Sequence, residues 1–88
     1  MKLLIDTTQR KKAIVTLENG INIIKEGESA LVLIEEILTE QQLHIADLTE
    51  ITANPGPGSY TGVRVGAAVV NALNFALGRE KIILPQYE

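Results

Sequence analysis

The sequence contains no cysteine, no tryptophan and a single histidine, and these absences exclude several kinds of chemistry. Without cysteine the chain has neither disulfides nor cysteine-based zinc sites, which is typical of a cytosolic protein. The lone histidine, His44, follows a helical pattern and stands beside Ile45. One imidazole makes neither a metal site nor a catalytic triad, so we expect His44 to be an ordinary surface or loop residue.

Aromatic residues and positive charge are also scarce. The aromatics are Tyr60, Phe75 and Tyr87, so the core of this 88-residue chain must be aliphatic and little base stacking is possible. Eight Lys and Arg residues against eleven Asp and Glu give a net charge of −3. This charge argues against a stand-alone nucleic-acid binder, whose affinity rests on neutralising phosphates. We expect any RNA contact to come through a basic partner.

Long hydrophobic runs are missing as well. Three consecutive apolar residues follow Lys2, too few for the core of a signal peptide. The second predicted helix is too short, and carries too many polar groups, to span a membrane. We expect a cytoplasmic chain without membrane contact.

What is present is an ordered series of strand and helix patterns within one small domain, residues 1–88. Asn19-Gly20 between two strand patterns predicts a β-hairpin, because both residues tolerate positive φ. The predicted strands are residues 2–7, 13–18, 21–25, 51–53 and 82–84, and the predicted helices are residues 29–42 and 61–77. The order β-β-β-α-β-α-β predicts an α/β fold with a mixed five-stranded sheet and two helices, a ribonuclease H-like lobe of the kind found in actin-like ATPases.

A glycine-rich stretch, NPGPGSYTGVRVG at residues 54–66, joins the fourth predicted strand to the second helix. A Walker A loop needs a lysine and a hydroxyl residue after its last glycine, but Gly62 is followed by Val63. The dinucleotide fingerprint fails too, because the third glycine comes one position late and no acidic residue follows about twenty positions downstream. The residues alone favour a tight strand-to-helix turn in which Ser59 or Thr61 caps the helix, with a weak anion site beside Arg64 as the alternative.

The same stretch carries a family resemblance. GPGSYTGVRVG closely resembles the signature of the TsaB family, also called YeaZ, and LLIDTT and NALNFALG are similar to that family's opening strand and the end of its second helix. The signature residues are Gly56, Pro57, Gly58, Ser59, Tyr60, Thr61, Gly62, Arg64 and Gly66. The resemblance implies an actin-like ATPase fold and a role beside the enzyme TsaD, which makes threonylcarbamoyladenosine next to the anticodon of tRNA.

Several departures qualify what the resemblance implies. TsaD-like enzymes carry a His-x-x-x-His metal pair on their first helix, whereas residues 29–36 contain no histidine. Asp6 is followed by Thr7, Thr8 and Gln9 instead of a glycine-containing phosphate hairpin, so we expect Asp6 to be structural. The sequence ends after the first lobe of the family fold. We therefore expect the second lobe to be absent, and with it the nucleotide cleft between lobes.

Both predicted helices carry more apolar surface than one sheet can cover. A helical wheel of the first helix places Ala30, Leu31, Ile34, Ile37 and Leu38 toward the sheet. On the second helix, the interior polar residues Arg64, Asn71 and Asn74 form one narrow stripe, which we expect to face outward. The candidate docking residues are Val32, Leu33, Ala67, Val70, Asn71 and Asn74.

These features predict a non-catalytic partner subunit of a TsaD-like enzyme that docks through both helices and reaches tRNA only through the complex. We expect no cofactor in the isolated chain, with ATP and metal held by the partner enzyme. Two further hypotheses stay open. One is a small nucleotide- or anion-binding enzyme using Asp6, the glycine turn and Arg64, and the other is a homodimeric structural module whose helices pair with a second copy.

Overall fold

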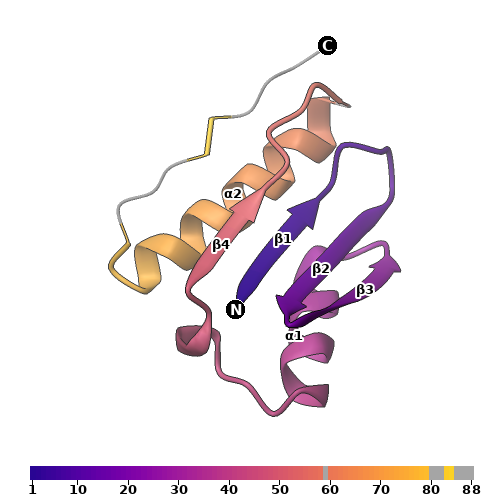
Figure 1. Cartoon of the computed structure of the whole chain (residues 1–88). Helices are drawn as coiled ribbons and strands as arrows, with labels where there is room; N and C mark the ends of the chain where they lie inside the picture. The colour runs from indigo at the N-terminus through magenta and orange to yellow at the C-terminus, as the bar shows by residue number, and fades with distance from the viewer. Residues whose placement is uncertain (59, 80–82, 85–88) are drawn as a thin grey trace.

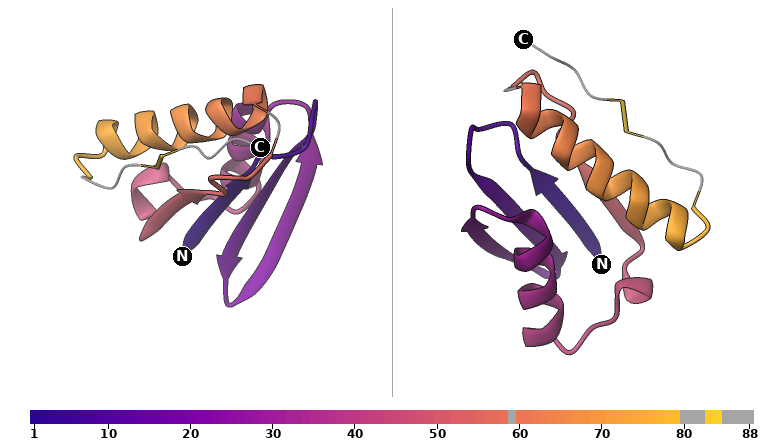
Figure 2. Two further views of the ribbon diagram at one scale, coloured as in Figure 1. Left: turned by 90° about the horizontal axis from the view of Figure 1, so that it is seen from above. Right: turned by 180° about the vertical axis from the view of Figure 1, so that it is seen from behind.

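The computed structural model describes residues 1–58, 60–79 and 83–84. A mixed sheet carries both long helices on one face (Figures 1 and 2). The elements in chain order are β1 (Lys2–Asp6), β2 (Ala13–Asn19), β3 (Ile21–Gly27), α1 (Ala30–Glu40), the short 3-10 helix η1 (Ile45–Asp47), β4 (Glu50–Ala53) and α2 (Tyr60–Ala76). The predicted α/β class, its mixed sheet and its two helices are confirmed.

The strands lie in the order β3-β2-β1-β4. β1 pairs antiparallel with β2, β2 pairs antiparallel with β3, and β1 pairs parallel with β4. The predicted hairpin is confirmed: Asn19 lies opposite Ile21, and Gly20 between them has a φ of 81° that favours glycine. The parallel β4 follows from the helical crossover through α1.

The core lies between the sheet and the two helices. Leu3, Ile5, Val15, Leu17 and Ile51 alternate with half-buried residues along their strands and are almost completely buried. α1 packs mainly on β2 and β3, and α2 packs mainly on β4 and β1. No described aromatic side chain belongs to this core, so the predicted aliphatic core is confirmed for that part of the chain.

The rotation of α1 differs from the prediction. Leu33 is buried and Leu31 is 59% exposed, whereas the helical wheel placed Leu31 inside and Leu33 outside. The run of five apolar residues at 30–34 fills more than one helical turn, so the sequence pattern alone does not fix which side faces the sheet. Packing decides it: the Leu33 side chain lies over Gly27, where a Cβ would stand 3.2 Å from Leu33 Cδ2.

The fifth predicted strand is not found among the described residues, whose sheet has four strands. Ile82 lies outside the described residues, and Ile83 and Leu84 are not in a strand. The reason lies in the partners of the Ile83 backbone. Its N–H donates to Asn71 Oδ1 at 2.7 Å and its carbonyl accepts from Asn71 Nδ2 at 3.0 Å, so a side-chain amide takes the place of a neighbouring strand.

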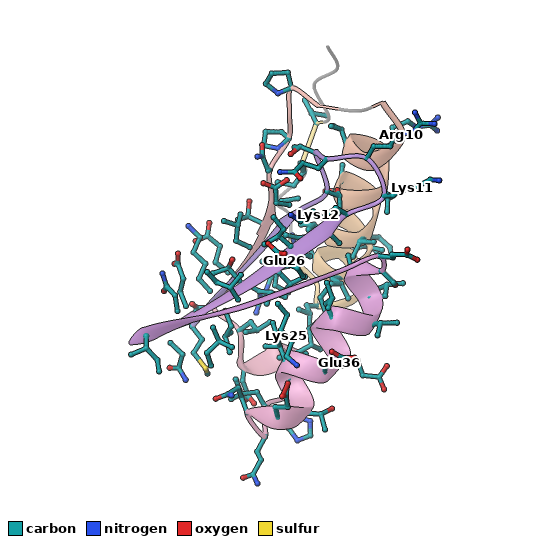
Figure 3. The ribbon with its side chains drawn as sticks, turned by 90° about the vertical axis from the view of Figure 1, so that its right-hand side faces the viewer. Arg10, Lys11, Lys12, Lys25, Glu26 and Glu36 are labelled. Atoms are coloured by element: carbon teal, nitrogen blue, oxygen red, sulfur yellow. The ribbon has the colours of Figure 1, made fainter. Side chains whose placement is uncertain are left out.

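The opposite face of the sheet bears no helix among the described residues. Leu4, Ile14 and Thr16 are half-buried on this face. The ion pair between Lys12 Nζ and Glu26 Oε1, 3.6 Å long, lies on the same face (Figure 3). Within the described part of the chain, no helix has the length and apolar character needed to cross a membrane.

Candidate functional site

The carboxylate of Asp6, at the end of β1, organises the glycine-rich turn. Asp6 Oδ1 accepts hydrogen bonds from the Thr8 backbone N–H at 2.9 Å and from Thr8 Oγ1 at 2.6 Å, and Asp6 Oδ2 accepts from Asn54 Nδ2 at 3.3 Å. Asn54 Oδ1 in turn accepts from the N–H of Gly56, whose φ of 106° favours glycine. Asp6 therefore joins the end of β1 to the start of the turn, which supports its predicted structural role.

These hydrogen bonds also determine the protonation state of Asp6. Partial burial raises the pKa of the carboxyl, but the bonds from Thr8 and Asn54 to the ionised form outweigh it, so the pKa lies below its ordinary value of 3.8. Asp6 is therefore ionised at neutral pH. Three hydrogen bonds from Thr8 and Asn54 hold this carboxylate in place.

Two glycines of the signature allow α2 to approach the end of β1. A Cβ on Gly58 would stand 2.7 Å from Thr8 Cβ and 2.8 Å from the Thr8 carbonyl oxygen. A Cβ on Gly66 would collide with Thr7 Oγ1, which is buried and donates to the Gly62 carbonyl at 2.6 Å. At Gly58 an added side chain would meet the Thr8 backbone, and at Gly66 it would meet the buried, hydrogen-bonded side chain of Thr7.

The remaining signature residues are placed less completely. Ser59, a predicted helix cap, lies outside the described residues. Tyr60 and Thr61 form the first turn of α2, and Arg64 lies exposed one turn further along. The peptide bond between Gly56 and Pro57 is cis.

Among the described residues, no three His, Cys, Asp or Glu side chains lie close enough together to form a metal site. His44 is exposed at the start of η1, as its predicted surface position requires.

Four of the six predicted docking residues are buried, so their assignment to an outer surface is wrong. Leu33 is 6% exposed and Val70 is 0% exposed, and Ala67 and Asn74 are also buried. All four face the sheet. Asn74 was assigned outward because it is polar, but its Nδ2 donates to the carbonyl of Ile51 in β4 at 3.2 Å. That hydrogen bond offsets the cost of burying the amide.

The other two predicted docking residues have different positions. Asn71 is half-buried and holds the Ile83 backbone through the two hydrogen bonds described above. Val32 is 52% exposed on α1, so its place on a docking surface stays a prediction.

The exposed apolar side of the two helices contains residues that were not among the predicted docking residues. Val65 is 46% exposed and Phe75 is 85% exposed. Together with exposed neighbours they form what we call the outer helix surface: Leu31 and Val32 on α1, and Val65, Ala68, Ala72 and Phe75 on α2. The spacing 65, 68, 72 and 75 is that of one helical face, which is the signal that could have revealed it.

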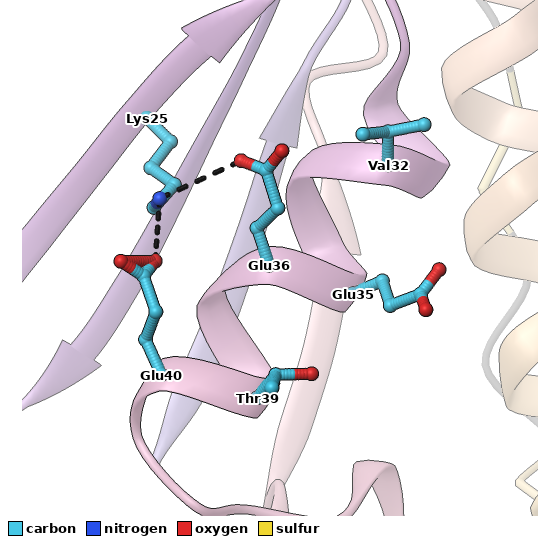
Figure 4. Close-up of a pocket in the computed structure, with 6 residues that line it drawn as sticks. All are labelled: Lys25, Val32, Glu35, Glu36, Thr39 and Glu40. Carbon is cyan, nitrogen blue, oxygen red and sulfur yellow. Dashed lines mark ion pairs between the residues drawn. The ribbon is translucent and has the colours of Figure 1, made fainter.

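An open groove of about 510 Å³ runs along α1 and is partly acidic (Figure 4). Lys25 of β3 forms ion pairs there with Glu36, at 3.5 Å, and with Glu40. The hydrogen bond to Glu40 raises the pKa of the Lys25 ammonium group. Val32, Glu35 and Thr39 complete the lining. One lysine thus pairs with two of the three glutamates, so the groove keeps a net negative charge.

Comparison with known proteins places this geometry in a family. A family model described as TsaD, tRNA N6-adenosine threonylcarbamoyltransferase, matches residues 25–86. The chain is 38% identical over 50 residues to the tRNA threonylcarbamoyladenosine biosynthesis protein TsaB of Escherichia coli (strain K12). It is 38% identical over 55 residues to TsaB of Haemophilus influenzae (strain ATCC 51907 / DSM 11121 / KW20 / Rd). These matches cover 57% and 62% of this chain but 21% and 22% of the relatives, so the chain matches about a fifth of their length.

Solved structures agree in fold. YeaZ from Pseudomonas aeruginosa superposes with a TM-score of 0.80 at 28% identity, over 89% of this chain and 40% of YeaZ. A second structure, described as an uncharacterized protein with similarity to peptidase YEAZ from Pseudomonas aeruginosa, gives a TM-score of 0.80 at 26% identity, over 96% of this chain and 42% of that one. The TsaD model spans more than half of the sequence, and the relatives are named TsaB and YeaZ, so the chain belongs to the TsaD family of threonylcarbamoyladenosine proteins, on its TsaB/YeaZ side.

Proposed function

We propose that this chain is a non-catalytic subunit in the threonylcarbamoyladenosine modification of tRNA and that it docks on a TsaD-like enzyme. The names of the relatives and of the family model support the pathway. The chain matches about a fifth of the curated relatives and 40% of YeaZ, so the partner role is inferred from this lobe's own surface. The fold is a ribonuclease H-like lobe of the actin-like ATPase kind.

The observation that carries the proposal is the outer helix surface. Phe75 leaves 85% of its side chain in water, and Val32, Val65 and Leu31 are each about half exposed. Scattered exposed aliphatics are normal, but an exposed phenylalanine on a helical face made of Val65, Ala68 and Ala72 is a typical interface anchor. Small alanines beside a large aromatic would let a partner helix approach closely and receive the ring between its side chains.

The Asp6 geometry supports the non-catalytic part of the proposal. Its carboxylate is occupied by Thr8 and Asn54, and the turn that follows is filled by the close contact of Gly58 with Thr8. The partner enzyme would supply the metal, the ATP site and most of the tRNA contact. This chain would stabilise or position it.

Mixing the purified chain with a TsaD-like enzyme and separating the species by size-exclusion chromatography tests the docking. The double variant Val65→Glu, Phe75→Glu should keep its circular dichroism spectrum and thermal midpoint, because both side chains already face water. It should fail to co-elute, because disrupted interface anchors typically cost about 2 to 4 kcal/mol.

Ile21→Glu, Ile24→Glu is the matched control, since Ile21 and Ile24 are exposed apolar residues on β3, away from the outer helix surface. This variant should still co-elute. Co-elution of the double variant would show that the outer helix surface is not the docking site.

Further measurements on the same preparation test the two other hypotheses, the homodimeric module and the small nucleotide-binding enzyme. A dimeric mass for the isolated chain, lost in the Val65→Glu, Phe75→Glu variant, would assign the outer helix surface to a second copy instead. Tight binding of ATP and magnesium without a partner, lost on Asp6→Ala, would favour the small enzyme.

A further inference from the structure

The loop between β1 and β2 concentrates positive charge on an otherwise acidic chain. Arg10, Lys11 and Lys12 are consecutive and supply three of the eight lysines and arginines, while the net charge is −3. In Figure 3, Arg10 and Lys11 project from the end of the sheet, away from the body of the molecule. We call these three residues the basic loop.

The tip of the basic loop, Arg10 and Lys11, differs in its ion pairing from Lys12 and from the lysines on the sheet. Lys2 lies 3.6 Å from Glu50, Lys25 pairs with Glu36 and Glu40, and Lys12 lies 3.6 Å from Glu26. Arg10 and Lys11 are exposed and form no ion pair with any described residue. Two cations at the tip are therefore available to an outside anion.

The conformation of the loop does not explain the presence of lysine at its tip. Lys11 has a φ of 57°, in the left-handed region where glycine or asparagine is favoured, and the turn is closed by the Lys12 N–H donating to the Gln9 carbonyl at 3.3 Å. A glycine would form this turn with less strain. The turn therefore gives no reason for a lysine at position 11, and a binding role for its cationic side chain is the better explanation.

A cavity of about 390 Å³ lies beside the basic loop. Thr7, Gly62 and Val65 line its other side, and Glu28 contributes the one carboxylate among its lining residues. Val65 belongs to the outer helix surface, so the basic loop borders the proposed docking surface. Glu28 disfavours an anion deep in this cavity, which leaves the rim at Arg10 and Lys11 as the place for one.

We propose that the basic loop contacts phosphate groups of an RNA backbone at the edge of the docking surface, an inference that rests on the proposed function. The guanidinium of Arg10 can hold a phosphate through two parallel hydrogen bonds, and the ammonium of Lys11 adds a mobile point charge. The loop contains no aromatic residue on which a base could stack, so the contact is independent of base sequence.

The test uses the isotope-labelled full chain and an unmodified tRNA transcript at low salt, followed by amide chemical shifts. Shift changes should be confined to residues 9–12 and the neighbouring start of α2, and should vanish when salt is raised. The double variant Arg10→Glu, Lys11→Glu should abolish them. The control Lys2→Glu, Lys25→Glu makes the same change in net charge elsewhere and should retain them. Absence of localised shifts, or equal loss in both variants, would overturn the proposal.

A second measurement separates this inference from the proposed function. Arg10→Glu, Lys11→Glu should co-elute with the TsaD-like enzyme as well as the wild type does. If co-elution is lost, the basic loop contacts an acidic protein surface and the RNA proposal is overturned. If neither protein co-elutes, the proposed docking fails, while the chemical-shift result still decides the RNA contact.

Discussion

The two faces of α2 have nearly the same chemistry and opposite environments. The inner face presents Val63, Ala67 and Val70 to the sheet, while the outer face presents Val65 and Phe75 to water. Polarity does not separate them, since the buried Asn74 lies on the inner face. The apolar composition of α2 therefore determines only how much apolar surface the helix has. Its packing against β4 and β1 determines which face is buried and which stays exposed.

The largest expected effect is a difference in stability between two variants, one with a glutamate on the inner face of α2 and one with a glutamate on the outer face. Val70→Glu should destabilise the fold by more than about 3 kcal/mol, because it buries an unpaired carboxylate in the core. Val65→Glu should change the free energy of unfolding by less than about 0.5 kcal/mol, because the residue is already exposed. Urea unfolding of both variants measures the difference, and similar losses in the two would mean that the faces are assigned incorrectly.

A smaller effect is expected where the inner face meets β1. Gly66→Ala should cost about 1 to 3 kcal/mol, because the added methyl group collides with Thr7 Oγ1. In a Thr7→Ala background the nearest remaining side-chain atom of residue 7 is Cβ at 3.5 Å, so the same change should cost less there. A double-mutant cycle from thermal or urea unfolding measures this coupling, and simple additivity would rule out the contact as the reason for the glycine.

The smallest effect concerns the polar contacts of Asp6. Its carboxyl pKa is lowered in the folded chain, so its contribution to stability is present above the ordinary value of 3.8 and is lost as pH falls through the folded value. Because Asp6 is only partly buried, we expect less than about 1 kcal/mol from this source. Urea midpoints of wild type and Asp6→Asn between about pH 6 and pH 3 should converge at the acid end, and a constant gap would contradict the assignment.

Much of the fold was predictable because it depends on local signals. Alternating residues in β2 and Asn19-Gly20 at the hairpin each act over a few positions. The non-strand backbone of Ile83 and Leu84 was not predictable in this way. The apolar run at residues 82–84 has the composition of a strand, but Asn71, twelve positions before Ile83, takes up the backbone groups of Ile83.

The candidate site shows the same division. The family resemblance located the signature turn, and the geometry gave Gly58 and Gly66 their reason in the close approach of Thr8 and Thr7. The docking residues were largely misplaced, because a helical wheel gives relative angles between residues without their orientation toward a sheet. Exposure in the folded chain had to supply the orientation.

The sequence by itself determined the aliphatic core, the order of the first four strands and the two helices, the hairpin and the family, since these depend on composition, short-range spacing and an eleven-residue motif. Only the tertiary structure decided that Leu33, Val70 and Asn74 face inward and that Phe75 faces outward. The physical reason is that α1 and α2 are apolar around most of their circumference. Their rotation is therefore set by contacts between distant segments, such as Leu33 over Gly27 and Asn74 on Ile51.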